Sequence, residues 1–327
     1  MLNTSRTAGL AVASFAKINL GLRVLGRRLD GYHEIRTTLQ SIDLADEIGM
    51  EPDASISLEV TGPYTVPADE TNLVQRAARA FAARFPGHGA RITLHKTIPA
   101  GAGLGGGSSN AAATLLGLER LWGLDVDPGV RYAIARDLGM DVPFFLYGGT
   151  CLGVGRGDEV LPLRDISPWS VVVVWPGVSL STAEVYSELP LALTRPRILS
   201  SMKGFVPASS ERAAGELGDS SDASDADERR PEVDGAEKRP PDVVNDLEET
   251  AFLKVPALRR LKDRLMASGA AAAAMSGSGS AVFGLFSSQQ VADRTAVSLS
   301  NVETAAFACR TLSRDAYHLK LFKRSRT

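Results

Sequence analysis

The sequence predicts a two-domain protein built from both strands and helices. Its 327 residues exceed the length at which a single hydrophobic core usually keeps growing. Alternating apolar and polar residues in the N-terminal part indicate an antiparallel-looking series of strands. A strand pattern, a glycine-rich loop and an Ala/Leu-rich helical pattern then follow one another between residues 91 and 122. The rest of the chain is organised around this last unit.

The segments before the glycine loop have periodicities that predict regular structure. Residues 10–25 alternate in part, which is typical of a β-hairpin or a bent strand. A loop from Gly26 to His33 leads to further strands predicted at 34–43, 45–51 and 55–60. Residues 72–85 form an amphipathic helical pattern whose aromatic positions belong to the core. Residues 91–98 alternate again and predict the strand that enters the loop.

Helices and strands continue to alternate after the loop. We expect helices at 109–122, from Pro128 to near Gly139, at 182–189 and from 243 to about 267. Strands are predicted at 150–154, 159–163 and 171–175, and on both sides of a Gly/Ser turn from Ser276 to Ser280. Residues 207–241 interrupt this pattern, because they are rich in acidic residues and contain no aromatic residue. Such a stretch cannot offset its chain entropy by apolar burial, so we expect a disordered acidic insertion there.

Composition excludes several classes of protein. Hydrophobic residues make up 44% and charged residues 23%, as in ordinary globular proteins. A formal net charge of -2 gives no case for a nucleic-acid partner. No apolar run reaches membrane length, and the short apolar segment near the N-terminus is too interrupted for a signal peptide. Cys151 and Cys309 fit no metal spacing and predict free thiols. We therefore expect a cytoplasmic enzyme or binding protein.

The glycine loop has the composition of an anion-binding site. Six glycines (Gly101, Gly103, Gly105, Gly106, Gly107 and Gly117) surround two serines and an asparagine within the stretch PAGAGLGGGSSNAAATLLGL. Glycines let backbone N–H groups turn towards a bulky anion, and the helix that follows adds its unpaired N–H groups and positive dipole end. A flexible turn needs fewer glycines than this. The sequence therefore predicts that something phosphorylated binds here.

Three anion-binding motifs compete for the loop. The Walker motif fails, because Gly107 stands where a lysine should precede Ser108. A GxGxxG pattern of the dinucleotide-binding kind occurs at Gly101, Gly103 and Gly106, but it is a weak signal in such a glycine-rich run. The third motif is the phosphate loop of the GHMP small-molecule kinases, which PAGAGLGGGSSNAAA closely resembles.

Candidate chemical groups lie outside the loop, each with a structural alternative. Lys17 interrupts an apolar run and would share a strand face with Asn19, although such a lysine is often one that extends to the surface. Tyr32 and His33 could stack on and hydrogen-bond to a flat heterocycle, or be ordinary loop residues. Asp141 is a turn or capping residue or a functional carboxylate, and the apolar residues after it suggest that it lies against a core.

Taken together, these motifs resemble one family, 4-diphosphocytidyl-2-C-methyl-D-erythritol kinase, a GHMP-type kinase of isoprenoid biosynthesis. The resemblance rests on AKINLGL, GYHE, the glycine loop, DVPF and SGSG in this order, and it covers residues 10–322 except the insertion. It implies a two-domain α+β fold. The N-terminal domain, residues 1–165, would contain the phosphate loop and a left-handed β-α-β crossover. The C-terminal domain, residues 166–327, would be an α/β sandwich that carries the acidic insertion.

The resemblance also implies a reaction, the ATP-dependent phosphorylation of the 2-hydroxyl of 4-diphosphocytidyl-2-C-methyl-D-erythritol. Asp141 would accept the proton of the hydroxyl, and Lys17 would orient or polarise the reacting groups. The substrate would contact Asn19, Tyr32, His33, Thr182 and Tyr186. The ATP phosphates would be held by the loop residues Ala100, Gly101, Ala102, Gly103, Leu104, Gly105, Gly106, Gly107, Ser108, Ser109 and Asn110.

The remaining expectations concern cofactors and partners. Phosphoryl transfer from ATP implies Mg²⁺, for which the sequence assigns no acidic ligand and offers only Ser109 as a candidate. We expect ATP and a CDP-linked methylerythritol as ligands, no nucleic acid, no membrane, and a monomer or homodimer. Three alternatives stay open: a GHMP kinase acting on homoserine or mevalonate, a non-catalytic nucleotide-binding module, and a dehydrogenase that binds NAD through the GxGxxG pattern.

Overall fold

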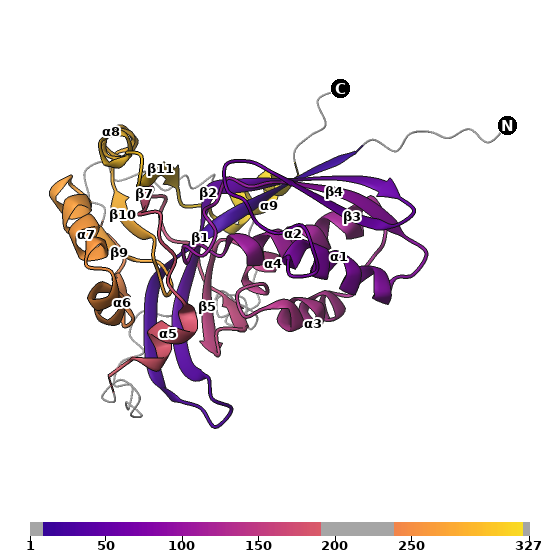
Figure 1. Ribbon diagram of the computed structural model, residues 1–327, viewed down its shortest axis with the longest axis horizontal. Helices are drawn as coiled ribbons and strands as arrows, with labels where there is room; N and C mark the ends of the chain where they lie inside the picture. Colours follow the sequence, from indigo (N-terminus) through magenta and orange to yellow (C-terminus); the bar gives the residue numbers. More distant parts are fainter. Residues whose placement is uncertain (1–8, 191–238, 323–327) are drawn as a thin grey trace, which may run out of the picture.

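The computed structural model describes residues 9–190 and 239–322, which form two β-sheets with helices packed on them (Figure 1). The first sheet has seven strands in the order β3-β4-β2-β1-β8, with β5 paired to β2 and β6 paired to β5. Its strands are β1 (Leu10–Arg27), β2 (His33–Asp53), β3 (Ile56–Thr61), β4 (Gly89–His95), β5 (Thr150–Gly155), β6 (Glu159–Pro162) and β8 (Val244–Asn245).

One expectation about the first sheet was wrong. Residues 34–43 and 45–51 belong to one continuous strand, β2, rather than two. The strand stays continuous because each half has its own partner, with residues 35–40 on β5 and residues 47–53 on β4. β3 pairs parallel to β4 across a helix, and β4 lies outside the strand series predicted at 34–60. This β-α-β unit is where the predicted crossover falls, and its left-handedness stays a prediction.

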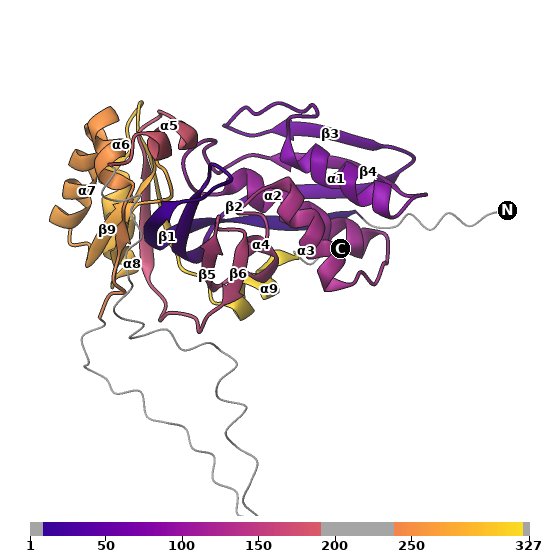
Figure 2. The same cartoon turned by 90° about the horizontal axis from the view of Figure 1, so that it is seen from below.

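Helices cover one face of the first sheet (Figures 1 and 2). They are α1 (Leu73–Arg84), α2 (Gly106–Leu121), α3 (Pro128–Leu138) and α4 (Phe144–Tyr147). Asn72 begins α1 by accepting a hydrogen bond from the backbone N–H of Val74 at 2.9 Å, as expected of an N-cap asparagine. Phe81 of α1 is fully buried, which confirms that the aromatic face of this helix belongs to the core.

The second sheet is antiparallel, with the order β11-β7-β10-β9. It consists of β7 (Ser170–Trp175), β9 (Ala272–Met275), β10 (Val282–Phe286) and β11 (Ala305–Arg310). The helices α6 (Glu248–Lys254), α7 (Ala257–Ala267) and α8 (Gln289–Leu299) lie on its outer side (Figure 1). The four valines of β7 are all buried, because Val172 and Val174 pack with the helices while Val171 and Val173 pack towards the first sheet. The two sheets thus share an apolar layer.

The C-terminal part of the chain does not form its core alone. The short strand β8 adds to β1, and Tyr317 and Leu321 of α9 (Arg314–Leu321) are buried in the core of the first sheet. The domain division between residues 165 and 166 stays a prediction. Two elements after this boundary, β8 and α9, pack with the first sheet. The helical run predicted from 243 to 267 is broken after Lys254, because Pro256 lacks a backbone N–H and disfavours a helical Val255.

The predicted acidic insertion at 207–241 lies, apart from its last three residues, outside the described residues. Cys151 and Cys309 are buried and free, as predicted. None of the helices in the described ranges combines the length and apolar character needed to cross a bilayer.

Candidate active site

A cavity of about 800 Å³ opens between β1, β2, the glycine loop and α5 (Thr182–Ser187). Its walls include every residue that the sequence assigned to catalysis or to substrate binding, namely Lys17, Asn19, Tyr32, His33, Asp141, Thr182 and Tyr186. These residues come from segments far apart in the chain, and the structure brings them together in one place. Their individual roles are taken up below as proposals.

The glycine loop forms one end of the cavity through Gly103, Gly105 and Ser108. Gly105 adopts a left-handed conformation with φ of 69° and is the N-cap of α2, which begins at Gly106 rather than at the predicted Ser109. In the described part of the chain, no side chain caps this end of α2. The N–H groups of the first turn are therefore free to bind an anion, helped by the helix dipole.

The loop packs directly on the Gly/Ser turn of the second sheet. A Cβ atom at Gly103 would lie 2.1 Å from the carbonyl oxygen of Ser276, so only glycine fits there. The Ser276 hydroxyl donates to the carbonyl of Gly103 at 2.9 Å, and the N–H of Ala281 donates to the carbonyl of Ala102 at 2.9 Å. Gly277 and Ser278 of the same turn line the cavity. The turn therefore supports the loop and completes one wall.

Two predicted loop residues lie elsewhere. Ser109 is buried and accepts a hydrogen bond from the Ser14 hydroxyl at 2.8 Å. Asn110 is buried too and donates to Ser14 Oγ and to Asp46 Oδ2, both at 2.8 Å. Because α2 starts early, it is the preceding serine, Ser108, that reaches the cavity. The geometry thus gives no support to Ser109 as a metal ligand.

Asp46 lies beneath the loop in a buried network that the sequence did not reveal. Its carboxylate is fully buried and accepts from Lys96 Nζ at 2.5 Å and from the N–H groups of Thr97 and Ile98 at 2.6 and 2.8 Å. Together with Asn110 these contacts fasten the end of β4 to α2. Burial lowers the pKa of Lys96, and the adjacent carboxylate opposes that shift. Asp46 is one of several charged residues of β2, so its residue type gave no signal in the sequence.

Lys17 and Asp141 form an ion pair in the wall of the cavity. The ammonium of Lys17 lies 3.5 Å from Asp141 Oδ2 and donates to Asn19 Oδ1 at 2.7 Å. The Lys17 side chain is 4% exposed, whereas that of Asp141 is 38% exposed. The expectation that the Asp141 carboxylate lies against a core was therefore wrong, because Phe144 and Phe145 fill the core instead. A cation and an accessible carboxylate stand side by side, next to the anion-binding loop.

Aromatic and polar groups line the opposite end of the cavity. The rings of His33 and Tyr186 are 5.1 Å apart, and the hydroxyls of Thr182 and Ser278 are 2.8 Å apart. Burial and the charge of Arg27 lower the pKa of His33, so its imidazole is neutral at pH 7. Burial and the charge of Asp141 raise the pKa of Tyr186, which keeps its phenol protonated. This end suits a flat, uncharged ring with hydrogen-bonding edges.

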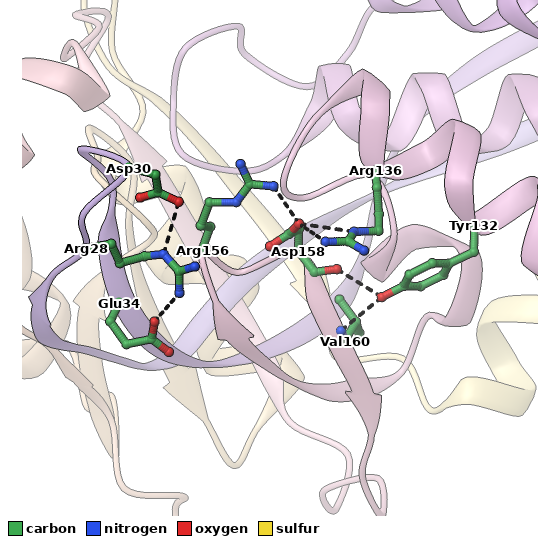
Figure 3. A network of polar contacts seen from close by, with 8 residues as sticks. All are labelled: Arg28, Asp30, Glu34, Tyr132, Arg136, Arg156, Asp158 and Val160. Carbon is green, nitrogen blue, oxygen red and sulfur yellow. Dashed lines mark hydrogen bonds and ion pairs between the residues drawn. The ribbon is translucent and has the colours of Figure 1, made fainter.

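Arg156 is a cavity residue that the sequence did not single out. Its guanidinium lies 5.2 Å from the centre of the Tyr32 ring and pairs with the buried carboxylate of Asp158 at 3.0 Å (Figure 3). Arg136 of α3 holds the same carboxylate at 2.8 Å. Although burial acts to raise the pKa of Asp158, the hydrogen bonds from the two arginines outweigh it and lower that pKa. The network joins α3 to the turn between β5 and β6, beside the exposed Tyr32.

No group of three or more His, Cys, Asp or Glu side chains suited to a metal occurs among the described residues. The residues that line the cavity near the loop and carry side-chain oxygens include Ser108 and Asp141. A cation held here would need oxygen ligands from a bound molecule or from water.

Comparison with known proteins decides among the three anion-binding motifs considered for the glycine loop. Residues 72–149 match the GHMP kinases N terminal domain, and residues 236–303 match the GHMP kinases C terminal region. The chain is 43% identical over 291 residues to 4-diphosphocytidyl-2-C-methyl-D-erythritol kinase of Solibacter usitatus, covering 87% of this chain and 83% of that protein. The enzyme of the same name from Syntrophus aciditrophicus is 38% identical over 303 residues, covering 92% and 98%.

The chain belongs to the 4-diphosphocytidyl-2-C-methyl-D-erythritol kinase family.

Solved structures agree with this kinase family. A crystal structure of 4-(cytidine 5'-diphospho)-2C-methyl-D-erythritol kinase matches with a TM-score of 0.69 and 35% identity, covering 92% of this chain and 98% of that chain. This confirms the predicted two-domain α+β fold. Homoserine kinase from Cytophaga hutchinsonii matches with a TM-score of 0.63 but only 16% identity, covering 96% and 97%, so it shares the fold alone. Membership of a kinase family leaves the weak GxGxxG pattern without a role in NAD binding.

Proposed function

We propose that the chain transfers the γ-phosphoryl group of ATP to the 2-hydroxyl of 4-diphosphocytidyl-2-C-methyl-D-erythritol, a step of the methylerythritol phosphate pathway to isoprenoids. The observation that carries the proposal is the single cavity, in which an anion-binding helix end, the Lys17 and Asp141 pair and an aromatic pocket adjoin one another. The family relatives, which have the corresponding name, support the choice of substrate.

Each end of the cavity takes one substrate in this proposal. The backbone N–H groups at the start of α2 bind the ATP phosphates, with Gly103 and Gly105 allowing their close approach. The neutral imidazole of His33 hydrogen-bonds to the edge of the cytosine, and Tyr32 and Tyr186 contact its faces. Asn19 and Thr182 hydrogen-bond to the methylerythritol. The reacting hydroxyl then lies near the middle of the cavity.

The reaction needs only positioning and charge. The Asp141 carboxylate accepts the proton of the 2-hydroxyl, since it is the accessible carboxylate beside the loop. The Lys17 ammonium stabilises negative charge on the transferring group.

The oxygen groups near the loop are compatible with Mg²⁺, which prefers oxygen ligands and completes its shell with phosphates and water. Ser108 and Asp141 would hold it, and when bound it would neutralise charge on the ATP phosphates. The cytoplasmic location and the monomeric or dimeric state expected from the sequence stay predictions.

Acceptor-dependent release of ADP tests the proposal. The purified protein should release ADP from ATP and Mg²⁺ when the cytidyl substrate is present, and not with homoserine or mevalonate. CMP should compete with the cytidyl substrate, because both need the aromatic pocket. Indifference to cytidine compounds would favour another acceptor, and ATP binding without ADP release would favour a nucleotide-binding module.

The Asp141→Asn variant tests the chemistry itself. We expect kcat to fall by about 10²- to 10⁴-fold with ATP binding retained, as for the loss of a general base. The matched control is Asp137→Asn, the same change at an exposed position of α3 outside the cavity, which should keep the wild-type kcat. A normal kcat in Asp141→Asn would remove this carboxylate from the mechanism.

A further inference from the structure

Thr37 of β2 lines the cavity, yet the proton of its hydroxyl is used inside the protein. The residue is 3% exposed. Its hydroxyl donates to the backbone carbonyl of Gly21 at 2.8 Å and accepts from the side-chain amide of Asn19 at 2.7 Å. A hydroxyl has a single proton, so Thr37 has none left to give to a bound molecule. The side chain that this hydroxyl holds is that of Asn19.

The directions of these hydrogen bonds are fixed by the chemistry of their ends. The carbonyl of Gly21 can only accept, so it takes the proton of Thr37 and leaves the Thr37 oxygen as an acceptor. The Asn19 atom that faces this oxygen must then be the Nδ2 nitrogen. Asn19 Oδ1 is thereby turned to the other side, where it accepts from the Lys17 ammonium, which can only donate. Both ends require the same orientation of the amide.

A β-bulge in β1 lets both Gly21 and Asn19 reach Thr37. Asn19 pairs with Leu39 on β2, whereas Gly21 pairs with Thr38, so β1 has one extra residue at this point. The bulge interrupts the ladder and re-aims the neighbouring groups, as bulges beside active sites do. It brings the Gly21 carbonyl and the Asn19 side chain to the same threonine.

The orientation of Asn19 matters because Lys17 has two competing neighbours. Asn19 Oδ1 holds the ammonium at 2.7 Å, while the Asp141 carboxylate lies 3.5 Å away. If Asn19 turned its amide nitrogen towards Lys17, the two donors would repel each other. The ammonium would then move onto Asp141 and occupy the carboxylate that accepts the substrate proton.

We propose that Thr37 is a positioning residue, which sets the orientation of the Asn19 amide and thereby keeps the Lys17 ammonium off Asp141. The inference rests on the proposed function, because it gives Lys17 and Asp141 their roles. The effect depends on the two hydrogen bonds of the Thr37 hydroxyl, which a side chain of the same shape without a hydroxyl could not make. The methyl group of the same side chain is packing and has no part in the effect.

The test compares two substitutions that separate hydroxyl from shape. Thr37→Val keeps the shape and loses the hydroxyl, and we expect kcat to fall roughly three- to tenfold, the effect of one lost hydrogen bond, with the KM for ATP unchanged. Thr37→Ser keeps the hydroxyl and should retain most of the wild-type kcat. Thr38→Val, the same change one position along on the opposite face of β2 and outside the cavity, is the matched control. A packing role predicts the reverse order, with serine worse than valine.

A double-mutant cycle checks that Thr37 acts through Asn19. In an Asn19→Ala background, Thr37→Val should cause no further loss of kcat, because the amide that it orients is gone. Additive losses, or a Thr37→Val variant as active as wild type, would overturn the proposal. If the wild-type protein itself releases no ADP with the cytidyl substrate, the proposed function fails, which is distinct from an active wild type in which Thr37 proves dispensable.

Discussion

The buried pair of Asp46 and Lys96 allows a sharp prediction about stability. Both side chains are almost fully buried, and Asp46 also receives hydrogen bonds from two backbone N–H groups and from Asn110. Asp46→Asn removes the negative charge and turns one oxygen into a donor that faces other donors. The Lys96 ammonium is then left buried without its counter-ion, although it still donates to the carbonyl of Ile98 at 2.8 Å.

The magnitude follows from this count of partners. Breaking a buried ion pair from one side costs about 3–5 kcal/mol, so we expect Asp46→Asn to lower the free energy of unfolding by that amount. Lys96→Met should cost less, because the Asp46 carboxylate keeps three hydrogen-bond donors after the ammonium is gone. The two changes are therefore unequal, although they break the same ion pair.

Urea denaturation followed by circular dichroism measures both effects, with the thermal midpoint as a second readout. The midpoint of Asp46→Asn should fall on the order of 10 °C. Asp125→Asn, the same substitution at an exposed position, should stay within about 0.5 kcal/mol of wild type. The reasoning is refuted if Asp46→Asn behaves like this control, or if Lys96→Met proves the more damaging of the two.

Two further predictions concern ligand binding. Because burial and Arg27 lower the pKa of His33, the KM for the cytidyl substrate should be flat from about pH 7 to 8. It should rise once the pH falls through that lowered pKa and the imidazole gains a proton, and His33→Gln should abolish that rise. The folded state also binds this proton more weakly than the unfolded chain, so the contribution of His33 to stability increases with pH from its lowered pKa up to about 6.5. Ser108→Ala should raise the KM for ATP roughly three- to tenfold, whereas Ser109→Ala should leave steady-state kinetics unchanged and cost about 1 kcal/mol of stability. Equal kinetic effects of the two serine changes would contradict the position of α2.

The sequence predicted most helices and strands because their apolar periodicity is local information. The helix at 72–85, for example, follows from the spacing of its apolar residues and from its N-cap Asn72. It did not predict that β2 continues through residue 44, or that β3 lies parallel to β4. Both depend on which strand lies alongside, and periodicity along one strand does not specify its partner.

The candidate site also combines residues that local sequence reveals with residues whose role depends on distant partners. Lys17, Tyr32, His33 and Asp141 stood out because their residue types are unusual in their local setting and match a family motif. Asp46, Thr37 and Arg156 did not, since an acid, a threonine and an arginine within or beside strands are ordinary residues. Their importance comes from contacts with partners distant in sequence, such as Lys96 on Asp46. Residues proposed to act directly on a ligand were thus more visible in the sequence than residues that hold others in place.

The bulge in β1 shows why strand periodicity alone could not build this site. The alternation along residues 10–25 puts Leu20 and Leu22 on one face, together with Ile18. In the structure Ile18 and Leu20 pack between the two sheets, whereas Leu22 packs with the helices of the second sheet and lines the cavity. The extra residue of β1 near Leu20 reverses the alternation.

That reversal aligns Lys17, Asn19 and Leu22 along one wall of the cavity. A regular strand would turn Leu22 to the face opposite Asn19. The bulge also leaves the carbonyl of Gly21 free to accept the Thr37 proton, on which the orientation of Asn19 depends. One inserted residue in the strand therefore shapes the wall of the cavity and sets the direction of the hydrogen bonds behind Lys17.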